Sequence, residues 1–323
     1  MGRLISEKYA AWQAECEARF QQLKKNEEEL NRIFIDIYGL QDELTPDVAD
    51  KDVTVHRVFD SKDDVPESMK GSNYVRTMRD EIVSLISYAV GCMFGRYSLD
   101  VEGLAYAGGE WDESRYKTFL PDEDNCIPVT DEEYFKDDIV GRFVEFVRTV
   151  YGSDTLEENL NFVANALAGK GSTSREVIRN YFLNDFIKDH IKTYQKRPIY
   201  WMFDSGKQNG FKALVYMHRW SADTTGNVRV EYLHRVQRVY ESEIARMQDT
   251  IDNSSNAREV SAAQKRKDKL TKQLKESKDY DAKIAHLALS RIDIDLNDGV
   301  KVNYEKVQTG QDGKKIEILA PIK

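Results

Sequence analysis

The segment of residues 194–220 constrains the fold more than any other part of the chain, because it predicts a β-hairpin inside a mostly helical sequence. Its first run, residues 199–203, is aromatic and favours a strand, and Pro198 precedes it where a strand tolerates proline. Residues 204–210 are rich in Asp, Ser, Gly and Asn, which adopt tight turns. The alternating run of residues 211–220 then predicts the return strand.

Basic residues surround the aromatic residues of this hairpin. A ribbon that combines cations with aromatic side chains can bind a nucleic-acid backbone. Alternatively, the aromatic residues fill a core and the cations merely surround it, because large aromatic side chains are usually buried. We expect Trp201 and Phe203 in the core and the turn exposed to DNA. The candidate DNA contacts of this segment are Lys196, Arg197, Lys207, Gln208, Asn209, Lys212 and Arg219.

Most of the remaining sequence predicts helices, so the expected fold is mainly α, of the α+β class: a helical bundle with an embedded β-hairpin and a long antiparallel helical pair. Apolar residues at steps of three or four predict amphipathic helices over residues 5–39 and 74–94. The Thr-x-x-Glu patterns that begin at Thr130 and Thr173 predict two capped helix starts. The tail, residues 298–323, alternates weakly and predicts a β-pair with its turn at "GQDG".

The helical pair follows from two apolar stripes, at residues 230–251 and 260–287, that are separated by the polar segment 252–256. Its second arm is rich in lysine. Such an arm either lies along DNA phosphates or is an ordinary solvated helix face, and the sequence leaves both interpretations open. The lysines that we take as candidate DNA contacts are Lys265, Lys267, Lys269 and Lys272.

Charge is divided along the chain. Residues 98–160 include 17 acidic and 5 basic residues, whereas residues 170–283 include 23 basic and 15 acidic residues. A formal net charge of −9 argues against nucleic acid as a partner, but phosphate contact depends on local charge. Composition and pattern together divide the chain into a long N-terminal helix (1–40), an acidic helical region (41–170), a helix plus β-hairpin (171–222), a basic helical pair (223–290) and a C-terminal tail (291–323).

Several other classes of site do not fit the sequence. No apolar run approaches the roughly 20 residues that span a membrane, and no secretory signal pattern is present, so we expect a cytoplasmic protein. Cys16, Cys92 and Cys126 are far apart and fit reduced thiols rather than a disulfide framework or a zinc site. Residues 293–299 look like a calcium loop, but Tyr304 occupies the position of the closing acid. We therefore expect no metal site.

Long stretches of the chain resemble, in the same order, the C-terminal region of BREX-type (PglX) adenine-specific DNA methyltransferases, the modification enzymes of a bacterial anti-phage system. The resemblance implies double-stranded DNA as a partner, together with a catalytic methyltransferase domain or other defence-system proteins. Besides the hairpin, the stretches that carry it are residues 27–48, 95–111 ("GRYSLDVEGLAYAGGEW"), 134–147, 174–190 and 296–308.

The motifs that catalysis requires are missing from these residues. An adenine methyltransferase needs a glycine-rich turn for S-adenosylmethionine and an Asn-Pro-Pro-aromatic loop for the flipped adenine. The chain has six prolines, none adjacent to another, and no Gly-x-Gly follows a strand-like run. The resemblance therefore implies a non-catalytic DNA-positioning and docking region, with no catalytic residue and no cofactor in this chain, and with S-adenosylmethionine bound elsewhere in the parent enzyme. The alternative is a helical scaffold of a defence complex that never touches DNA.

Overall fold

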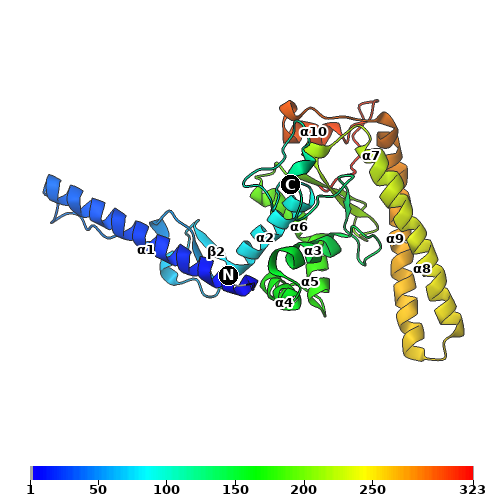
Figure 1. Cartoon of the computed structure of the whole chain (residues 1–323), viewed down its shortest axis with the longest axis horizontal. Helices are drawn as coiled ribbons and strands as arrows, with labels where there is room; N and C mark the ends of the chain where they lie inside the picture. Colours follow the sequence, from blue (N-terminus) through cyan, green and yellow to red (C-terminus); the bar gives the residue numbers. More distant parts are fainter. Residues whose placement is uncertain (1–2, 323) are drawn as a thin grey trace. The chain divides into compact units, whose positions relative to one another are not determined.

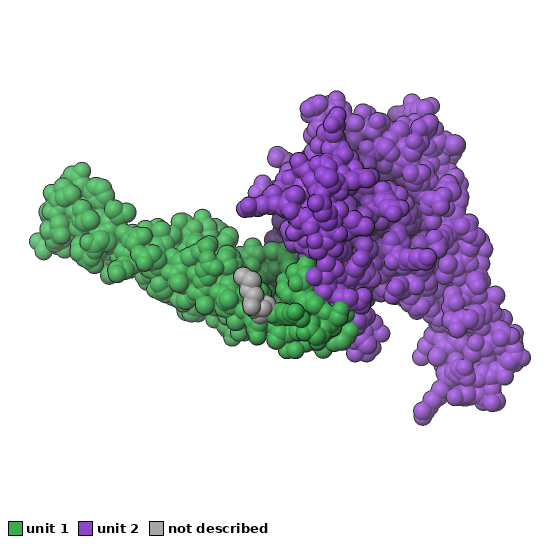
Figure 2. All heavy atoms as spheres, in the orientation of Figure 1, with its two compact units in different colours: residues 1–86, 150–168 green, residues 87–149, 169–323 purple. Residues whose placement is uncertain are grey.

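The computed structural model describes residues 3–322. Helices dominate it, and they are accompanied by one sheet of two strands and one of three, which confirms the predicted mainly α, α+β fold (Figure 1). The chain forms two compact units (Figure 2). Unit 1 contains the residues up to Ile86 together with Val150–Ala168, and unit 2 contains Ser87–Thr149 and the residues from Gly169 onwards.

Unit 1 is organised around the long helix α1 (Ile5–Tyr38), which ends at Gly39 in the left-handed conformation, as the sequence predicts. The first part of α1 buries Tyr9, Cys16 and Phe20 in small apolar clusters. Two short parallel strands and one further helix cover this part of α1. The other elements of unit 1 are β1 (Arg57–Phe59), β2 (Val75–Thr77), the first part of α2 (Met78–Met93), α4 (Leu156–Leu167) and the 3-10 turns Asp50–Asp52 and Glu67–Met69.

The apolar stripe predicted along α1 is buried over only part of its length. Ile5 and Cys16 are buried, whereas Leu30, Ile33 and Ile37 are exposed. The second predicted helix, α2, begins at Met78 rather than near residue 74. Its predicted first turn instead forms strand β2, whose residues pair with β1 in parallel register. Pairing with a distant strand overrides the helical periodicity of these residues.

Unit 2 contains the predicted hairpin. Strands β4 (Tyr200–Asp204) and β5 (Lys212–Tyr216) pair antiparallel, and β3 (Ile127–Pro128) adds to the other edge of β5. The other elements of unit 2 are the second part of α2, most of α3 (Ile139–Tyr151), α5 (Ser174–Asn184), α6 (Phe186–Thr193), α7 (Thr224–Asn227), the π-helical segment Val228–Leu233, α8 (His234–Asn253), α9 (Ala257–Ser290), α10 (Val300–Lys306) and the 3-10 turns Glu113–Arg115, Met217–Arg219 and Leu296–Asp298.

Both faces of the hairpin lie in the core of unit 2. Trp201 and Phe203 are each 0% exposed, which confirms the core prediction for these two residues. The opposite face is also covered, because Tyr200 stacks on Phe94 with the ring centroids 5.5 Å apart. On the first face, Trp201 packs against Trp220, with a centroid distance of 5.4 Å. Apart from Asp204 and Lys212 at the turn ends of the strands, β4 and β5 are therefore apolar at every position rather than at alternate ones.

The predicted helical pair is confirmed. Helices α8 and α9 lie side by side in Figure 1 and are joined by a short polar turn. Asn256 caps α9, because its side-chain oxygen accepts a hydrogen bond from Arg258 N at 3.0 Å. Apolar residues between the two helices, including Tyr240 and Leu270, are 0% exposed. The apolar stripes of the two helices are therefore buried against each other.

One of the two predicted capping boxes is wrong. Thr173 caps α5 as predicted, because its hydroxyl accepts a hydrogen bond from Glu176 N at 3.2 Å. Helix α3, however, does not begin after Thr130 but at Ile139, where the carboxylate of Asp138 accepts from Val140 N at 3.0 Å. Arg179 of α5 binds the same carboxylate at 2.7 Å, so a residue from a distant helix holds the cap in place.

The predicted β-pair of the tail is correct only at its turn. Residues 300–306 form helix α10 rather than a strand. The turn at residues 310–313 does form, with Gly313 N donating to the carbonyl of Gly310 at 2.9 Å, and Thr309 pairs with Lys315 across it. The chain then continues to the edge of β4, where Leu319 forms an antiparallel bridge with Phe203. The tail thus pairs with the hairpin as well as with itself.

Candidate nucleic-acid interface

The turn of the β-hairpin, residues 205–210, is fixed to helix α9 by the carboxylate of Glu276. Its Oε1 accepts hydrogen bonds from Ser205 Oγ at 2.8 Å and from Gly210 N at 3.0 Å, and its Oε2 accepts from Gln208 N at 2.8 Å. Hydrogen bonds to an ionised carboxylate are stronger than neutral ones. A Cβ atom on Gly210 would lie 2.5 Å from the carbonyl oxygen of Gln273, so this close approach requires glycine.

The side chains at the tip of this turn point to solvent. Lys207 and Gln208 are exposed, and Asn209 is half-buried with a left-handed φ of 53°. Among the residues that the structure describes, none forms an ion pair or a hydrogen bond with the ammonium group of Lys207. Its charge is therefore available to an anionic partner, at a position that Glu276 and Gly210 hold against α9.

Two of the predicted contacts lie inside unit 2 instead. Lys212 is 8% exposed, and its ammonium donates to the carbonyl of Leu183 at 2.8 Å. Arg219 donates to the carbonyls of Asp122 and Glu123 at 2.7 and 2.9 Å. Both cations donate to backbone carbonyls of segments distant in the sequence and tie those segments together. We therefore exclude them from the candidate interface.

Lys196 and Arg197 lie at a different place, in the connection between α6 and β4. Both side chains are exposed. Gln195 and Lys196 have φ values of 50° and 61°, so this connection turns through two successive left-handed residues. Lys196 lines a cavity with Lys301 of α10 and Lys315 of the C-terminal segment. Glu305 and Glu317 line the same cavity, so Lys196 belongs to a surface of mixed charge apart from the hairpin turn.

Four lysines, one histidine and two acidic residues of α9 form a row along one side of the helix. Residues that are alternately four and three positions apart stay on one side of an α-helix. Glu276, which holds the hairpin turn, is a member of this row, so the turn with Lys207 lies against it. We call these residues the α9 row: Lys265, Lys269, Lys272, Glu276, Asp279, Lys283 and His286.

The predicted lysines of α9 differ in their partners. Lys265 and Lys272 are exposed and have no ion-pair or hydrogen-bond partner among residues 3–322. Lys269 is paired with Asp131, whose side chain is only 7% exposed. Lys267 lies off the row and donates to the side-chain oxygen of Gln248 on α8. Of the four predicted lysines of α9, Lys265 and Lys272 are therefore the two whose charge is unpaired among the described residues.

An ion-pair cluster at Asp131 neutralises some of the basic residues of α9 with acidic residues of the same chain. Arg266 donates to the Asp131 carboxylate at 3.0 Å and lies 2.9 Å from a Glu132 oxygen. Burial tends to raise the pKa of Asp131, but the ammonium of Lys269 and the guanidinium of Arg266 outweigh it and lower that pKa below its ordinary value. The acidic segment thus binds the basic helix within one unit.

The described residues contain neither a metal site nor a membrane-spanning helix. Within residues 3–322, no three or more His, Cys, Asp or Glu side chains come together in a way that could hold a metal ion. None of the helices in this part of the chain is both long and apolar enough to cross a membrane.

The chain matches one region of the adenine-specific methyltransferases, which confirms the resemblance found in the sequence. It is 47% identical over 318 residues to the adenine-specific methyltransferase PglX of Lacticaseibacillus casei (strain Zhang). It is 38% identical over 333 residues to the adenine-specific methyltransferase BrxX of Escherichia coli O9:H4 (strain HS). These alignments cover 98% and 99% of this chain but 24% and 27% of the two relatives, so the chain spans about a quarter of their length. No family model matches it.

Proposed function

We propose that this chain is the DNA-positioning and docking region of a BREX-type adenine-specific DNA methyltransferase that acts in phage defence in the cytoplasm. The observation that carries the DNA role is the α9 row. Two of its lysines, Lys265 and Lys272, are unpaired among the described residues, and the hairpin turn brings unpaired Lys207 against the same row. Exposed cations without internal partners can release the counterions of a duplex, which is the main source of affinity for DNA.

The dimensions of the row suit a duplex. Lys283 follows Lys265 by 18 positions. At 1.5 Å per residue this is about 27 Å along the helix, somewhat less than the roughly 34 Å of one turn of DNA. Lysine contacts of this kind are made to phosphates and carry no sequence information. The role that fits them is therefore positioning of the duplex rather than recognition of bases.

Methyl transfer itself belongs to the rest of the parent enzyme in this proposal. The sequence lacks both the glycine-rich turn for S-adenosylmethionine and the Asn-Pro-Pro-aromatic loop for adenine. The catalytic domain would bind the cofactor and the flipped base, while this region would hold the flanking duplex. Loss of this region would then raise the concentration of DNA that methylation needs, because its phosphate contacts supply affinity for the duplex.

The test measures duplex affinity against salt concentration for the whole chain. We expect the triple variant Lys207→Gln, Lys265→Gln, Lys272→Gln to bind more weakly, and the slope of log affinity against log salt to become shallower by roughly 0.9 for each phosphate that the protein no longer neutralises. The matched control is Lys278→Gln, because Lys278 is paired with Glu241 at 2.7 Å on another side of α9. A triple variant with the wild-type slope would contradict the proposal.

The exposed face of α1 favours a second candidate, a scaffold that docks onto proteins and does not touch DNA. Large apolar side chains on one side of a helix and in contact with solvent are typical of protein-protein interfaces. Absence of duplex binding by the wild-type chain at low salt would favour this candidate over the first. The side chains that form the face are Leu30, Ile33, Phe34, Ile37 and Tyr38, which are 45–69% exposed.

A further inference from the structure

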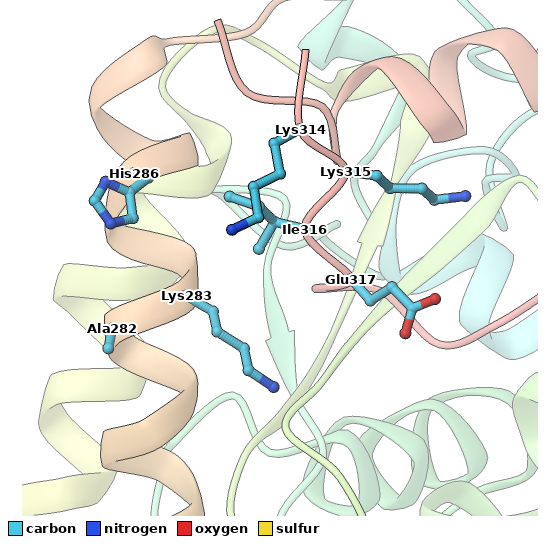
Figure 3. A pocket seen from close by; sticks show the side chains of 7 residues that line it. All are labelled: Ala282, Lys283, His286, Lys314, Lys315, Ile316 and Glu317. Atoms are coloured by element: carbon cyan, nitrogen blue, oxygen red, sulfur yellow. The ribbon is translucent and has the colours of Figure 1, made fainter. Parts of the chain in front are cut away.

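A groove between helix α9 and the C-terminal segment, residues 308–322, has no role in the function proposed above. Its volume is ≈ 570 Å³, within the range of small-molecule sites. In Figure 3 the side chains of Lys283 and Lys314 extend into the space between the two elements. The residues that line it are Ala282, Lys283 and His286 of α9 and Lys314, Lys315, Ile316 and Glu317 of the C-terminal segment.

The wall of the groove that the C-terminal segment forms is fixed by buried hydrogen bonds. Gln308 is 2% exposed, and its side-chain oxygen accepts from Ile318 N and Leu319 N, both at 3.1 Å. Tyr280 of α9 donates its hydroxyl to the carbonyl of Ile318 at 2.5 Å. Ala320 N donates to the carbonyl of Met202 at 2.8 Å, which ties the segment to the sheet. The groove is therefore already formed in the free protein.

The groove is strongly cationic. Lys283 and Lys314 have no ion-pair or side-chain hydrogen-bond partner among residues 3–322, and Lys315 lies 4.0 Å from its nearest carboxylate, that of Glu305. His286 completes the basic lining, and the one acidic residue among the described lining residues is Glu317. Because the ammonium groups of Lys283 and Lys314 have no partner among residues 3–322, the lining favours an anion.

The floor of the groove is apolar. Ile316 lies between the cations and is only half-buried. A neighbouring cavity of ≈ 420 Å³ shares His286, Lys314 and Ile316 and adds Leu289, whose side chain is 82% exposed. A large apolar side chain with this exposure beside a cationic rim suits a ligand that has both an anionic group and a flat apolar body.

We propose that this groove binds a single nucleotide unit, with its phosphate between Lys283 and Lys314 and its base against Ile316 and Leu289. Lys283 and His286 are the last members of the α9 row, so a nucleic-acid strand that follows the row arrives at the groove. The inference that the nucleotide belongs to a nucleic-acid strand rests on the proposed function. A free nucleotide has the same chemistry, and its binding does not depend on that function.

The experiment measures the affinity of the whole chain for two probes, a short single-stranded oligonucleotide and adenosine monophosphate. We expect the double variant Lys283→Gln, Lys314→Gln to lose at least about tenfold in affinity for the probe that binds, because two phosphate-facing charges are removed. Both side chains are exposed, so the melting temperature should not change. Leu289→Asp, which places a negative charge at the exposed edge, should weaken binding in the same direction.

The controls separate the two proposals. The matched variant Lys265→Gln, Lys272→Gln removes two cations of the same row that lie outside the groove, and it should leave the affinity for adenosine monophosphate unchanged. If the groove variant loses affinity for the oligonucleotide alone, the nucleotide bound in the groove belongs to a nucleic-acid strand. If it loses affinity for adenosine monophosphate, the groove binds a free nucleotide. Wild-type affinity of the groove variant for both probes would overturn the inference, whether or not the row binds a duplex.

Discussion

At the scale of single residues, three carboxylates meet around one tyrosine in unit 2. The hydroxyl of Tyr232 lies 2.9 Å from Asp124 Oδ2 and 2.8 Å from Asp137 Oδ2. Next to them, Asp122 accepts a hydrogen bond from Cys126 N at 2.9 Å. Burial, together with the negative charge of Asp124 and a hydrogen bond to it, raises the pKa of Asp122 to about 7. The folded protein therefore favours the protonated form of Asp122.

This raised pKa predicts a dependence of stability on pH. Because the pKa of Asp122 is higher in the folded state, its contribution is fully present below the ordinary pKa of about 4 and is lost as the pH rises through about 7. Asp122→Asn imitates the protonated acid. We expect it to raise the melting temperature at pH 8 and to leave it nearly unchanged at pH 4.

The matched control for this prediction is Glu123→Gln, which removes the same charge from an exposed neighbouring side chain. Its effect should be small at both pH values. Thermal unfolding of both variants at pH 4 and pH 8 provides the measurement. Equal shifts for the two variants at pH 8 would mean that Asp122 is ionised in the folded protein without cost.

At the scale of elements, the hairpin has two separate tasks. Its strands fill the core, and its turn lies against α9 through Glu276. Trp201 is 0% exposed, its ring centroid is 5.5 Å from that of Tyr304, and its Nε1 donates to the carbonyl of Pro198 at 2.9 Å. Lys207 at the turn is exposed and makes none of these contacts. Stability and binding to DNA should therefore respond to different residues of the same hairpin.

We expect Trp201→Ala to lower the free energy of unfolding by about 3–5 kcal/mol, because it removes a fully buried ring and leaves a cavity. Lys207→Ala should leave the free energy of unfolding within about 0.5 kcal/mol of wild type while weakening duplex binding. Chemical denaturation and duplex titration of the two variants measure both effects. A Trp201→Ala protein as stable as wild type would show that the hairpin is not part of the core.

At the scale of the whole molecule, the chain is similar to about a quarter of two methyltransferases, which are 47% and 38% identical to it. Some acidic and basic residues of the chain neutralise each other, as Arg266 does with Asp131 and Glu132. The basic residues that remain unpaired among residues 3–322 include Lys265 and Lys272 of the α9 row and Lys283 and Lys314 of the groove. A chain with an acidic pI near 5.3 can therefore still offer a local basic surface.

We expect the isolated chain to have no methyltransferase activity and no measurable affinity for S-adenosylmethionine. The reason is the missing glycine-rich turn and Asn-Pro-Pro-aromatic loop, since neither the cofactor nor the flipped adenine would have its usual site. Calorimetric titration with the cofactor is the measurement, and the intact parent methyltransferase is the positive control. One-to-one binding in the micromolar range would show that these residues hold an unrecognised cofactor site.

The sequence by itself determined the elements whose signals are local. The helical spacing of apolar residues predicted α1, α8 and α9, and Thr173 and Gly39 marked helix ends, because propensity and capping depend on residues within one or two turns. The aromatic run and glycine turn predicted the hairpin in the same way. The lysine-rich arm of the candidate interface was also visible, since it needs only composition and spacing.

Only the tertiary structure decided which of the basic residues are free. Lys212 and Arg219 have carbonyl partners in segments distant in the sequence, whereas Lys265 and Lys272 have no such partner among the described residues. The start of α3 at Ile139 likewise depends on Arg179 of another helix. A long cationic side chain reaches several ångströms, so the fold, rather than its sequence neighbours, determines the acceptors within its reach. For the same reason no local pattern predicts a groove between α9 and the C-terminal segment.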